Sequence, residues 1–401
     1  MPDMPDTAYL DHAATTPVRD DVIDVVARAL HSTGNPSALH GPGRTARARV
    51  EEARESVAES LGASPNEVVF TSGGTEADNL AVQGIYRARR SADPRRHRVL
   101  TAGIEHHAVL DTVAHLARVE AATTALCPVD QHGRIDLAAL ESAIASDPGT
   151  VALVAVMWAN NEVGTLQPVP EIAALGAEHG IPVHSDAVQA ISSVDVDFAA
   201  SGLAALAVTG HKIGAPVGTG ALLVRTDVDV HPVSHGGGQE RDIRSGTLDA
   251  AGAAGFAAAL RSTVAERDEH VRRLTELREL LVGGVLSAVP DAQVNGSPDP
   301  EQRLPGVTNI AFPGCEADSL MLLLDSAGVA CSTGSACSAG VPEASHVLAA
   351  MGFSNEQARG ALRFSLGHTS TRTDVERLTS VIGDVVERAR AARLATSARG
   401  G

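Results

Sequence analysis

The residue with the most distinctive chemistry in this chain is Lys212, because it is the only lysine among 32 basic residues. It follows the apolar residues 203–208 and the run Thr209-Gly210-His211, so it stands at the end of a predicted buried strand. Arginine supplies charge elsewhere, but only a lysine amine can lose its proton and add to a carbonyl. A surface lysine retained by chance is the alternative. The context favours a reactive amine at position 212.

Polar residues follow four of the predicted strands, each at the point where the strand ends. They are Thr71-Ser72-Gly73-Gly74-Thr75, Asn160-Asn161-Glu162, Ser185-Asp186 and Thr209-Gly210-His211-Lys212. The carboxyl ends of parallel strands meet at one edge of a sheet, where open α/β folds bind ligands. The pattern therefore predicts a single site. There Gly74 and Thr75 begin a predicted helix whose free N–H groups could hold a phosphate, although Gly-rich turns are often only turns.

Two further side chains suggest what this site holds. The carboxylate of Asp186 could keep a pyridine nitrogen protonated, and a helix N-cap is an equally common use of aspartate. His106 could pack against a flat ring in a chain whose aromatic content is only 2%, and a structural or surface histidine is the alternative. Combined with a reactive lysine and a phosphate cradle, these residues suggest pyridoxal phosphate.

The second reactive element is the stretch at residues 329–340, where small residues surround Cys331 and Cys337. This composition predicts a mobile loop with accessible thiols, whereas most free cysteines are small buried side chains. None of the four cysteines forms a C-x-x-C motif, so we expect neither a disulfide framework nor a metal site. An iron or zinc site built from Cys127, Cys331 and Cys337 is the alternative.

These groups require a scaffold of alternating strands and helices. Apolar runs that predict strands occur at residues 68–70, 98–100, 151–157, 181–183, 203–208 and 220–224. Helical patterns occur at residues 20–31, 44–61, 76–84, 260–286 and 373–394. The alternation predicts an α/β fold whose mostly parallel sheet is covered by helices on both faces.

Length and composition allow two or three domains. The 401 residues, 44% of them hydrophobic, suffice for a sizeable core. We expect a large domain at residues 20–258 and a smaller α+β domain formed by residues 1–19 and 259–394, which carries the cysteine loop. Residues 395–401 read as a frayed tail.

Charge and hydropathy limit the classes of partner. The net charge of −17 argues against direct binding to nucleic acid or anionic lipid. No apolar run approaches the roughly 18 residues of a membrane span. The first residues lack the basic and then apolar order of a signal peptide, so we expect a cytoplasmic protein.

Taken together, the motifs resemble those of cysteine desulfurases of the NifS/IscS type, which belong to the class V aminotransferase family and have the type I fold of pyridoxal-phosphate-dependent transferases. The resemblance extends from Tyr9 to Gly367, about nine-tenths of the chain. Its motifs are Tyr9-Leu-Asp-His-Ala-Ala-Thr-Thr-Pro17, Phe70-Thr-Ser-Gly-Gly-Thr-Glu76, Asn160-Asn-Glu-Val-Gly164, Ser185-Asp-Ala-Val-Gln189, Thr209-Gly-His-Lys212, His235-Gly-Gly-Gly-Gln-Glu-Arg241, Arg244-Ser-Gly-Thr247, Ser335-Ala-Cys337 and Arg363-Phe-Ser-Leu-Gly367.

The resemblance implies a role for each site residue. Lys212 would carry the cofactor and move protons, His106 would stack on the ring and assist as an acid–base group, and Cys337, not Cys331, would be the nucleophile. Cofactor contacts are implied for the pyridine nitrogen (Asp186), for the ring oxygen or substrate (Gln189 and Asn161), and for the phosphate (Gly74, Thr75, Thr209, His211, and Thr247 from the other subunit of a homodimer). Arg363 would bind the substrate carboxylate.

The implied reaction removes sulfur from L-cysteine, releases L-alanine and leaves a persulfide on Cys337. The sulfur would pass to an acceptor in iron–sulfur cluster biogenesis or tRNA thiolation. Only a few residues follow the predicted helix 373–394, whereas relatives that dock an iron–sulfur scaffold often carry a longer tail. The alternatives are a selenocysteine lyase, another aminotransferase-like enzyme that needs no loop thiol, and a scaffold protein that has kept the fold without the cofactor.

Overall fold

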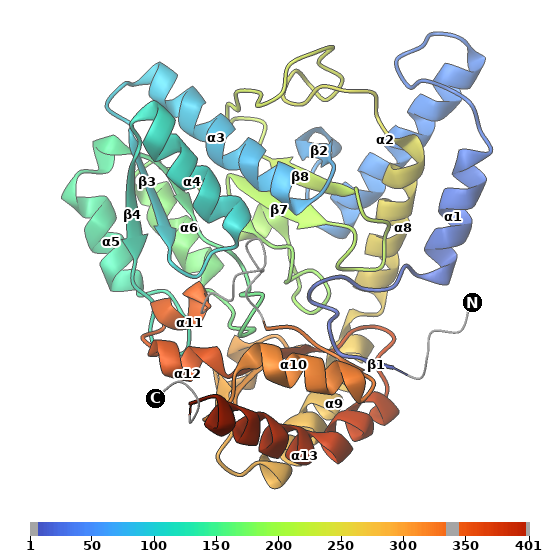
Figure 1. The fold of residues 1–401 in the computed structure, drawn as a ribbon. Helices are drawn as coiled ribbons and strands as arrows, with labels where there is room; N and C mark the ends of the chain where they lie inside the picture. Colours follow the sequence, from blue (N-terminus) through green and yellow to red (C-terminus); the bar gives the residue numbers. More distant parts are fainter. Residues whose placement is uncertain (1–6, 334–344, 398–401) are drawn as a thin grey trace.

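The computed structural model describes residues 7–333 and 345–397, and its central feature is a seven-stranded sheet (Figure 1). The strand order is β2-β8-β7-β6-β5-β3-β4, and every neighbouring pair is parallel except those that involve β8. The strands are β2 (Val68–Thr71), β3 (Arg98–Ala102), β4 (Thr123–Cys127), β5 (Val151–Ala155), β6 (Val183–Asp186), β7 (Ala205–Thr209) and β8 (Gly220–Val224). The predicted mostly parallel sheet is confirmed.

Alternate residues of each strand pack into separate cores on the two faces of the sheet, as the pleat requires. Phe70 of β2 and Leu206 of β7 belong to one core, whereas Val69 and Ala207 belong to the other. Because both faces are buried, the strand interiors are almost wholly apolar. Polar side chains are therefore concentrated where the strands end.

Helices cover both faces of the sheet (Figure 1). One face packs against α3 (Gly74–Ala92) and α4 (His107–Glu120). The other face packs against α1 (Asp20–Leu30), α2 (Gly41–Ser60), α5 (Leu137–Ser146), α6 (Val169–Glu178), α7 (Phe198–Ser201) and α8 (Ala250–Ala265). This arrangement leaves the carboxyl ends of β5, β6 and β7 open between the layers.

A further hydrophobic core lies below this sheet in the view of Figure 1. It is built around an antiparallel sheet of β12 (Ala361–Ser365), β10 (Val307–Ala311) and β9 (Gln293–Asn295), with the helices α9 (Arg267–Ala288), α10 (Ala317–Ser326) and α13 (Arg372–Ser397). The short helices α11 (His346–Ala350) and α12 (Asn355–Arg359) follow the gap at residues 334–344. Near the N-terminus β1 (Ala8–Tyr9) pairs in parallel with β11 (Val329–Ala330), so the first described residues join this core.

The single long helix predicted at residues 260–286 is wrong. The structure has two helices there, α8 and α9, which meet at Glu266. The small residues of α8 pack against α1 and α2, whereas α9 packs against α13 in the lower core. The carboxylate of Glu266 pairs with Arg19 at the junction. Periodicity continues across this junction, but the two helices bury their apolar faces in different cores.

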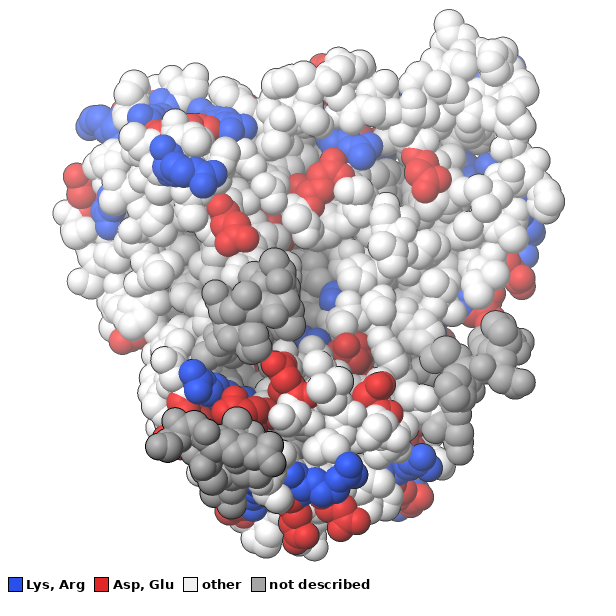
Figure 2. All heavy atoms as spheres, in the orientation of Figure 1, with Lys and Arg blue, Asp and Glu red and all other residues white. Residues whose placement is uncertain are grey.

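Charged side chains of both signs are interspersed over the face drawn in Figure 2, which is hollowed between its upper and lower parts. Among the described residues, no helix combines the length and the apolar character needed to cross a membrane.

Candidate active site

A cavity of about 350 Å³ opens where the strands of the large sheet end. It brings together almost all the site residues predicted from the sequence. Its lining includes Gly74, Thr75, His106, Asn161, Asp186, Gln189, Thr209, His211, Lys212 and Arg363. The ends of β2, β6 and β7, together with the segments after β3 and β5, place these groups as the parallel topology predicts.

Lys212 lies three residues beyond the end of β7, and its amine is turned toward the N-terminal part of the chain. Its Nζ donates hydrogen bonds to the carbonyl oxygens of Ala13 and, at 2.7 Å, of Ala14. Burial, with a smaller contribution from the nearby Arg363, lowers the pKa of Lys212 to about 8, against the opposing effects of Asp11 and Asp186. The amine can therefore lose its proton near neutral pH.

Asp186 is the last residue of β6 and is 6% exposed. Its Oδ1 accepts a hydrogen bond from Val188 N at 2.8 Å, and Oδ2 has no partner among the described residues. Burial, with a contribution from Asp78, raises the pKa of Asp186 to about 7. A cationic or N–H donor in the cavity would satisfy this carboxylate and favour its charged form.

His106 is the N-cap of α4, and its Nδ1 accepts a hydrogen bond from Ala108 N at 3.1 Å. This bond holds the imidazole in the cavity wall. Burial lowers the pKa of His106, and Lys212 and two neighbouring histidines lower it further, whereas Asp186 raises it. The ring is therefore neutral at pH 7.

The N-terminus of α3 forms the anion-binding end of the cavity. The first N–H groups of a helix have no partner within the helix, and they carry its positive dipole end. Gly73, at φ 145°, directs the chain into α3, and a Cβ at Gly74 would lie only 2.7 Å from Val188 Cγ2. The hydroxyls of Thr75 and Thr209 and the imidazole of His211 complete the lining.

Arg363 comes from β12 of the lower core and reaches into the cavity. Its Nη2 donates to Asp11 Oδ1 at 2.9 Å and its Nη1 to the carbonyl of Asn161 at 3.0 Å. Its Nε is buried and has no hydrogen-bond partner among the described residues. The residue is 5% exposed, so the two contacts of Nη1 and Nη2 hold the guanidinium rigidly.

The sequence reasoning missed the role of residues 11–16, which we call the 11–16 segment. It contacts three predicted site residues: Asp11 pairs with Arg363, and the carbonyl of Ala13 accepts hydrogen bonds from Lys212 and from Gln189 Nε2. The Asp-His-Ala-Ala-Thr-Thr motif was visible in the sequence. Nothing in its spacing indicated that it crosses the site.

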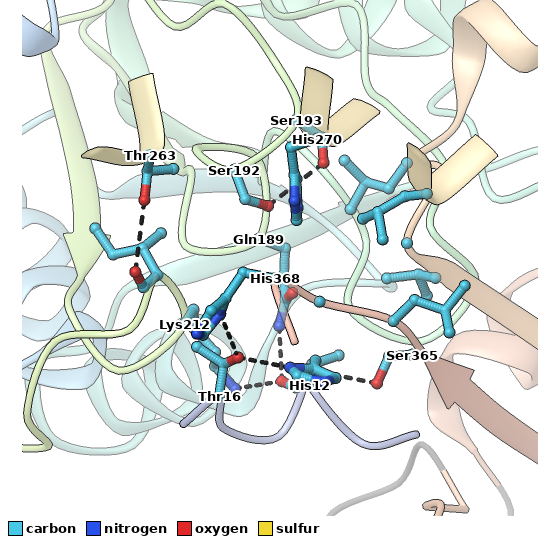
Figure 3. A pocket seen from close by; sticks show the side chains of 18 of the residues that line it. His12, Thr16, Gln189, Ser192, Ser193, Lys212, Thr263, His270, Ser365 and His368 are labelled. Carbon is cyan, nitrogen blue, oxygen red and sulfur yellow. Dashed lines mark hydrogen bonds between the residues drawn. The ribbon is translucent and has the colours of Figure 1, made fainter. Parts of the chain in front are cut away.

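The far side of the 11–16 segment faces a second, smaller cavity of about 50 Å³ (Figure 3). Here His12 Nδ1 and Thr16 Oγ1 lie 2.5 Å apart, and Thr16 Oγ1 also contacts His368 Nδ1 at 3.2 Å. The other ring nitrogen of His12 lies 3.4 Å from Thr369 Oγ1. This network holds the segment in place from behind.

A buried acidic group behind Asp186 was also missed. Asp78 of α3 lines the cavity, and its Oδ1 lies 3.0 Å from His184 Nε2 on β6. Burial raises the pKa of Asp78 well above its usual value and lowers the pKa of His184 to about 4. An aspartate among the apolar positions of a helix was the available signal.

One described residue of the predicted site lies elsewhere. Thr247 lines a separate cavity with Ser72 and Arg244. Cys337 falls outside the described residues. Cys331 is described, and burial, with a further contribution from Asp11, raises the pKa of its thiol to about 12. Cys331 is therefore protonated at neutral pH and poorly suited to nucleophilic attack.

Comparison with known proteins places the chain among enzymes. The family model described as Aminotransferase class-V matches residues 8–378. The chain is 53% identical to an IscS-like cysteine desulfurase of Mycobacterium tuberculosis, over 97% of this chain and 99% of that protein. It is 42% identical to the cysteine desulfurase IscS of Methanosarcina thermophila, over 95% and 92% of the two chains.

Solved structures show the same similarity. A structure titled NifS-like protein superposes with a TM-score of 0.87 at 33% identity, covering 95% of this chain and 99% of the other. A structure of SspA in complex with cysteine superposes with a TM-score of 0.75 at 32% identity, covering 89% and 98%.

Proposed function

This chain belongs to the class V aminotransferase family as a pyridoxal-phosphate-dependent cysteine desulfurase, and we propose that Cys337 receives the sulfur of L-cysteine while L-alanine leaves. The observation that carries the proposal is the convergence of Lys212, Asp186 and Arg363 in one cavity. These are an amine with a lowered pKa, an unpaired carboxylate oxygen and a guanidinium with an unused donor.

The residues of the cavity fit the cofactor. The start of α3, with Gly74, Thr75, Thr209 and His211 around it, provides donors suited to a phosphate. Asp186 would pair with the pyridine nitrogen, His106 would lie against the ring, and Gln189 and Asn161 would contact the ring oxygen or substrate. When bound, pyridoxal phosphate supplies an electron sink that weakens the bonds at the substrate Cα.

Lys212 would hold the cofactor and then act as the base and acid at the substrate. A pKa of about 8 places the amine close to the pH at which it both accepts and donates a proton. The carbonyls of Ala13 and Ala14 fix where the nitrogen lies. Because Nδ1 of the neutral His106 ring accepts from Ala108 N, its proton lies on Nε2, which would donate toward the cavity as an acid group.

Arg363 would bind the carboxylate of L-cysteine. A guanidinium binds a carboxylate best through two parallel hydrogen bonds. Asp11 and the carbonyl of Asn161 fix its orientation from the sides, which reduces the entropy lost on binding.

The approach of the chain to the cavity supports Cys337 as the sulfur acceptor. Ser332 lines the cavity and is joined to Arg363 by two backbone hydrogen bonds of 2.7 and 3.2 Å. Five residues of chain span at most about 17 Å, so Cys337 is within reach of the bound substrate. The Sγ of Cys337 attacks the substrate sulfur, and the bond between that sulfur and the substrate carbon breaks. The electron pair of the broken bond stays on this carbon, which then takes up a proton.

Replacing Cys337 with serine tests this assignment. We expect Cys337→Ser to keep the cofactor but to form no enzyme persulfide from labelled cysteine, with alanine production reduced about 10²-fold or more. The matched control is Cys331→Ser, which should keep most of the activity. Undiminished persulfide on Cys337→Ser would contradict the proposal and would favour an enzyme that needs no loop thiol.

The remaining functional proposals concern partners and organisation. We propose a cytoplasmic homodimer in which Thr247 completes the phosphate site of the partner subunit; its location outside its own cofactor cavity supports this. The sulfur acceptor would be an iron–sulfur scaffold or a tRNA-thiolation protein.

The domain division at 20–258 and at 1–19 with 259–394 is supported by the packing of Ala8 and Leu10 with Leu274 and later residues.

A further inference from the structure

A cavity of about 450 Å³ lies away from the active site, against α9 and β9. Its lining shares no residue with the cofactor cavity or with the smaller cavity beside it. Its polar walls are Arg278, Arg303, Gln131, His132 and Asn295, and its apolar walls include Val282, Val294 and Phe353. It therefore combines two guanidinium groups with apolar surface.

Arg278 is the unusual member of this lining. It is 8% exposed, yet it makes no hydrogen bond and no ion pair with any described residue, and its Nε is fully buried. By contrast, Arg273 of the same helix donates to the carbonyls of Gly367, His368 and Ser370, and Arg267 pairs with Asp195. Only Nε is fully buried, so the Nη groups are the donors that can face the cavity, and no described acceptor binds them.

The surrounding charges do not compensate Arg278. Burial, with a smaller contribution from Arg303, lowers the pKa of Arg278 to about 10, and Glu279 opposes this effect without forming an ion pair. Arg303 uses Nη1 to donate to the carbonyls of Ser297 and Pro298, so its side chain is anchored beside the cavity. His132, the remaining titratable group of the lining, contacts the carbonyl of Gly296 through Nδ1 at 3.1 Å.

We propose that this cavity binds a small organic anion whose phosphate or carboxylate group lies between Arg278 and Arg303. A guanidinium group can donate two parallel hydrogen bonds to a planar carboxylate or to a tetrahedral phosphate. The amides of Gln131 and Asn295 lie within the same lining, and Phe353 with Val282 and Val294 would contact the organic part. An anion there supplies the partner that Arg278 lacks.

Calorimetric titration of the full-length enzyme, saturated with cofactor, tests this site with two probes of equal apolar part, phenyl phosphate and benzoate. We expect saturable binding of at least one probe, with a stoichiometry of one per chain. Arg278→Gln should weaken it about ten- to hundredfold, because a charge-assisted hydrogen bond is lost. Preference for phenyl phosphate identifies a phosphorylated ligand, and preference for benzoate a carboxylate.

The matched control is Arg272→Gln, which removes the same charge from an exposed position on the same helix. It should change the affinity less than about twofold. Absence of saturable binding to the unmodified enzyme would overturn the proposal, as would equal weakening by Arg272→Gln and Arg278→Gln.

A measurement on the unmodified enzyme keeps the test independent of whether Arg278→Gln folds. Phenylglyoxal modifies accessible arginines, and peptide mass mapping reads each position. We expect the preferred probe to protect the peptide that carries Arg278 but not the one that carries the exposed Arg95. Equal modification of Arg278 with and without the probe would contradict binding at this cavity.

Discussion

The two cavities that meet at Lys212 differ in how their polar groups are partnered. In the larger one, Asp186 keeps an oxygen unpaired and Arg363 keeps Nε unpaired. In the smaller one, His12 contacts Thr16 through one ring nitrogen and Thr369 through the other. The 11–16 segment separates them and presents Ala13 to Lys212.

This difference indicates a division of tasks. Unpaired buried groups lower stability but are ready to bind a ligand, as in active sites that trade stability for activity. Fully paired groups contribute stability and hold their neighbours in position. Substitutions in the larger cavity should therefore reduce activity with little loss of stability, and substitutions in the smaller one should do the reverse.

The largest expected effect is that of Lys212→Ala. Loss of the amine removes both the cofactor attachment and the proton transfer, so the rate of alanine formation should fall about 10³-fold or more. The melting temperature of the apo forms should be nearly unchanged. Lys212→Arg is the control for charge, and we expect it to be as inactive as Lys212→Ala. Activity retained by Lys212→Arg would show that only the charge matters.

Arg363→Gln should act mainly on substrate binding. Removing the guanidinium from the substrate carboxylate should raise KM for L-cysteine about 10- to 100-fold, because a charged hydrogen-bonded pair is lost. The matched control is Arg377→Gln, which removes an exposed arginine that donates to a backbone carbonyl far from the cavity. Steady-state kinetics of Arg363→Gln and Arg377→Gln measures whether KM rises only in the first variant. An unchanged KM in Arg363→Gln would remove this residue from the substrate site.

His12→Asn tests the expected role of the smaller cavity, which is to contribute stability. The shorter amide cannot bridge Thr16 and Thr369, and we expect a loss of about 1–3 kcal/mol in the free energy of unfolding, measured with urea. Because the catalytic groups stay in place, kcat should fall less than about tenfold. An activity loss as large as that of Lys212→Ala, without a stability loss, would contradict the division of tasks.

The last expected effect is on the pH dependence of stability, with no expected change in activity at neutral pH. Burial lowers the pKa of His12 to about 3, well below its unfolded value near 6.5, so the folded state binds fewer protons below pH 6.5. This histidine therefore contributes stability above pH 6.5 that is lost as the pH falls toward 3, by up to about 1.4 kcal/mol per pH unit. Relative to the unmodified enzyme, His12→Asn should lose less stability between pH 6.5 and 4.5. Parallel curves would contradict this role of His12.

How much of the site could be predicted depended on where each residue lies in the chain. Asp186, Thr209 and Lys212 follow strands directly, and a parallel sheet brings strand ends together, so the sequence pattern was sufficient. The contact of Lys212 with Ala13 joins positions 199 residues apart, and no local pattern indicates it. The pairing of Arg363 with Asp11, 352 residues apart, was equally hidden.

The fold shows the same limit. Alternating apolar runs predicted the sheet, because each strand interior is buried on both faces. The break between α8 and α9 was missed, since helix-forming residues continue across Glu266 and no local signal marks the change of core there. Local patterns thus predicted most strands of the large sheet, but not the edge strand β4, the smaller sheet, or the partners against which the helices pack.

The central claim is that Lys212 carries the cofactor, and borohydride reduction of the holoenzyme followed by peptide mass mapping tests it most directly. Lys212 has the only lysine amine in the chain, so the N-terminal amine is the only other primary amine available. We predict that the mass of the reduced cofactor appears on the peptide that contains Lys212. Its absence from that peptide, or its presence on the N-terminal peptide alone, would contradict the account.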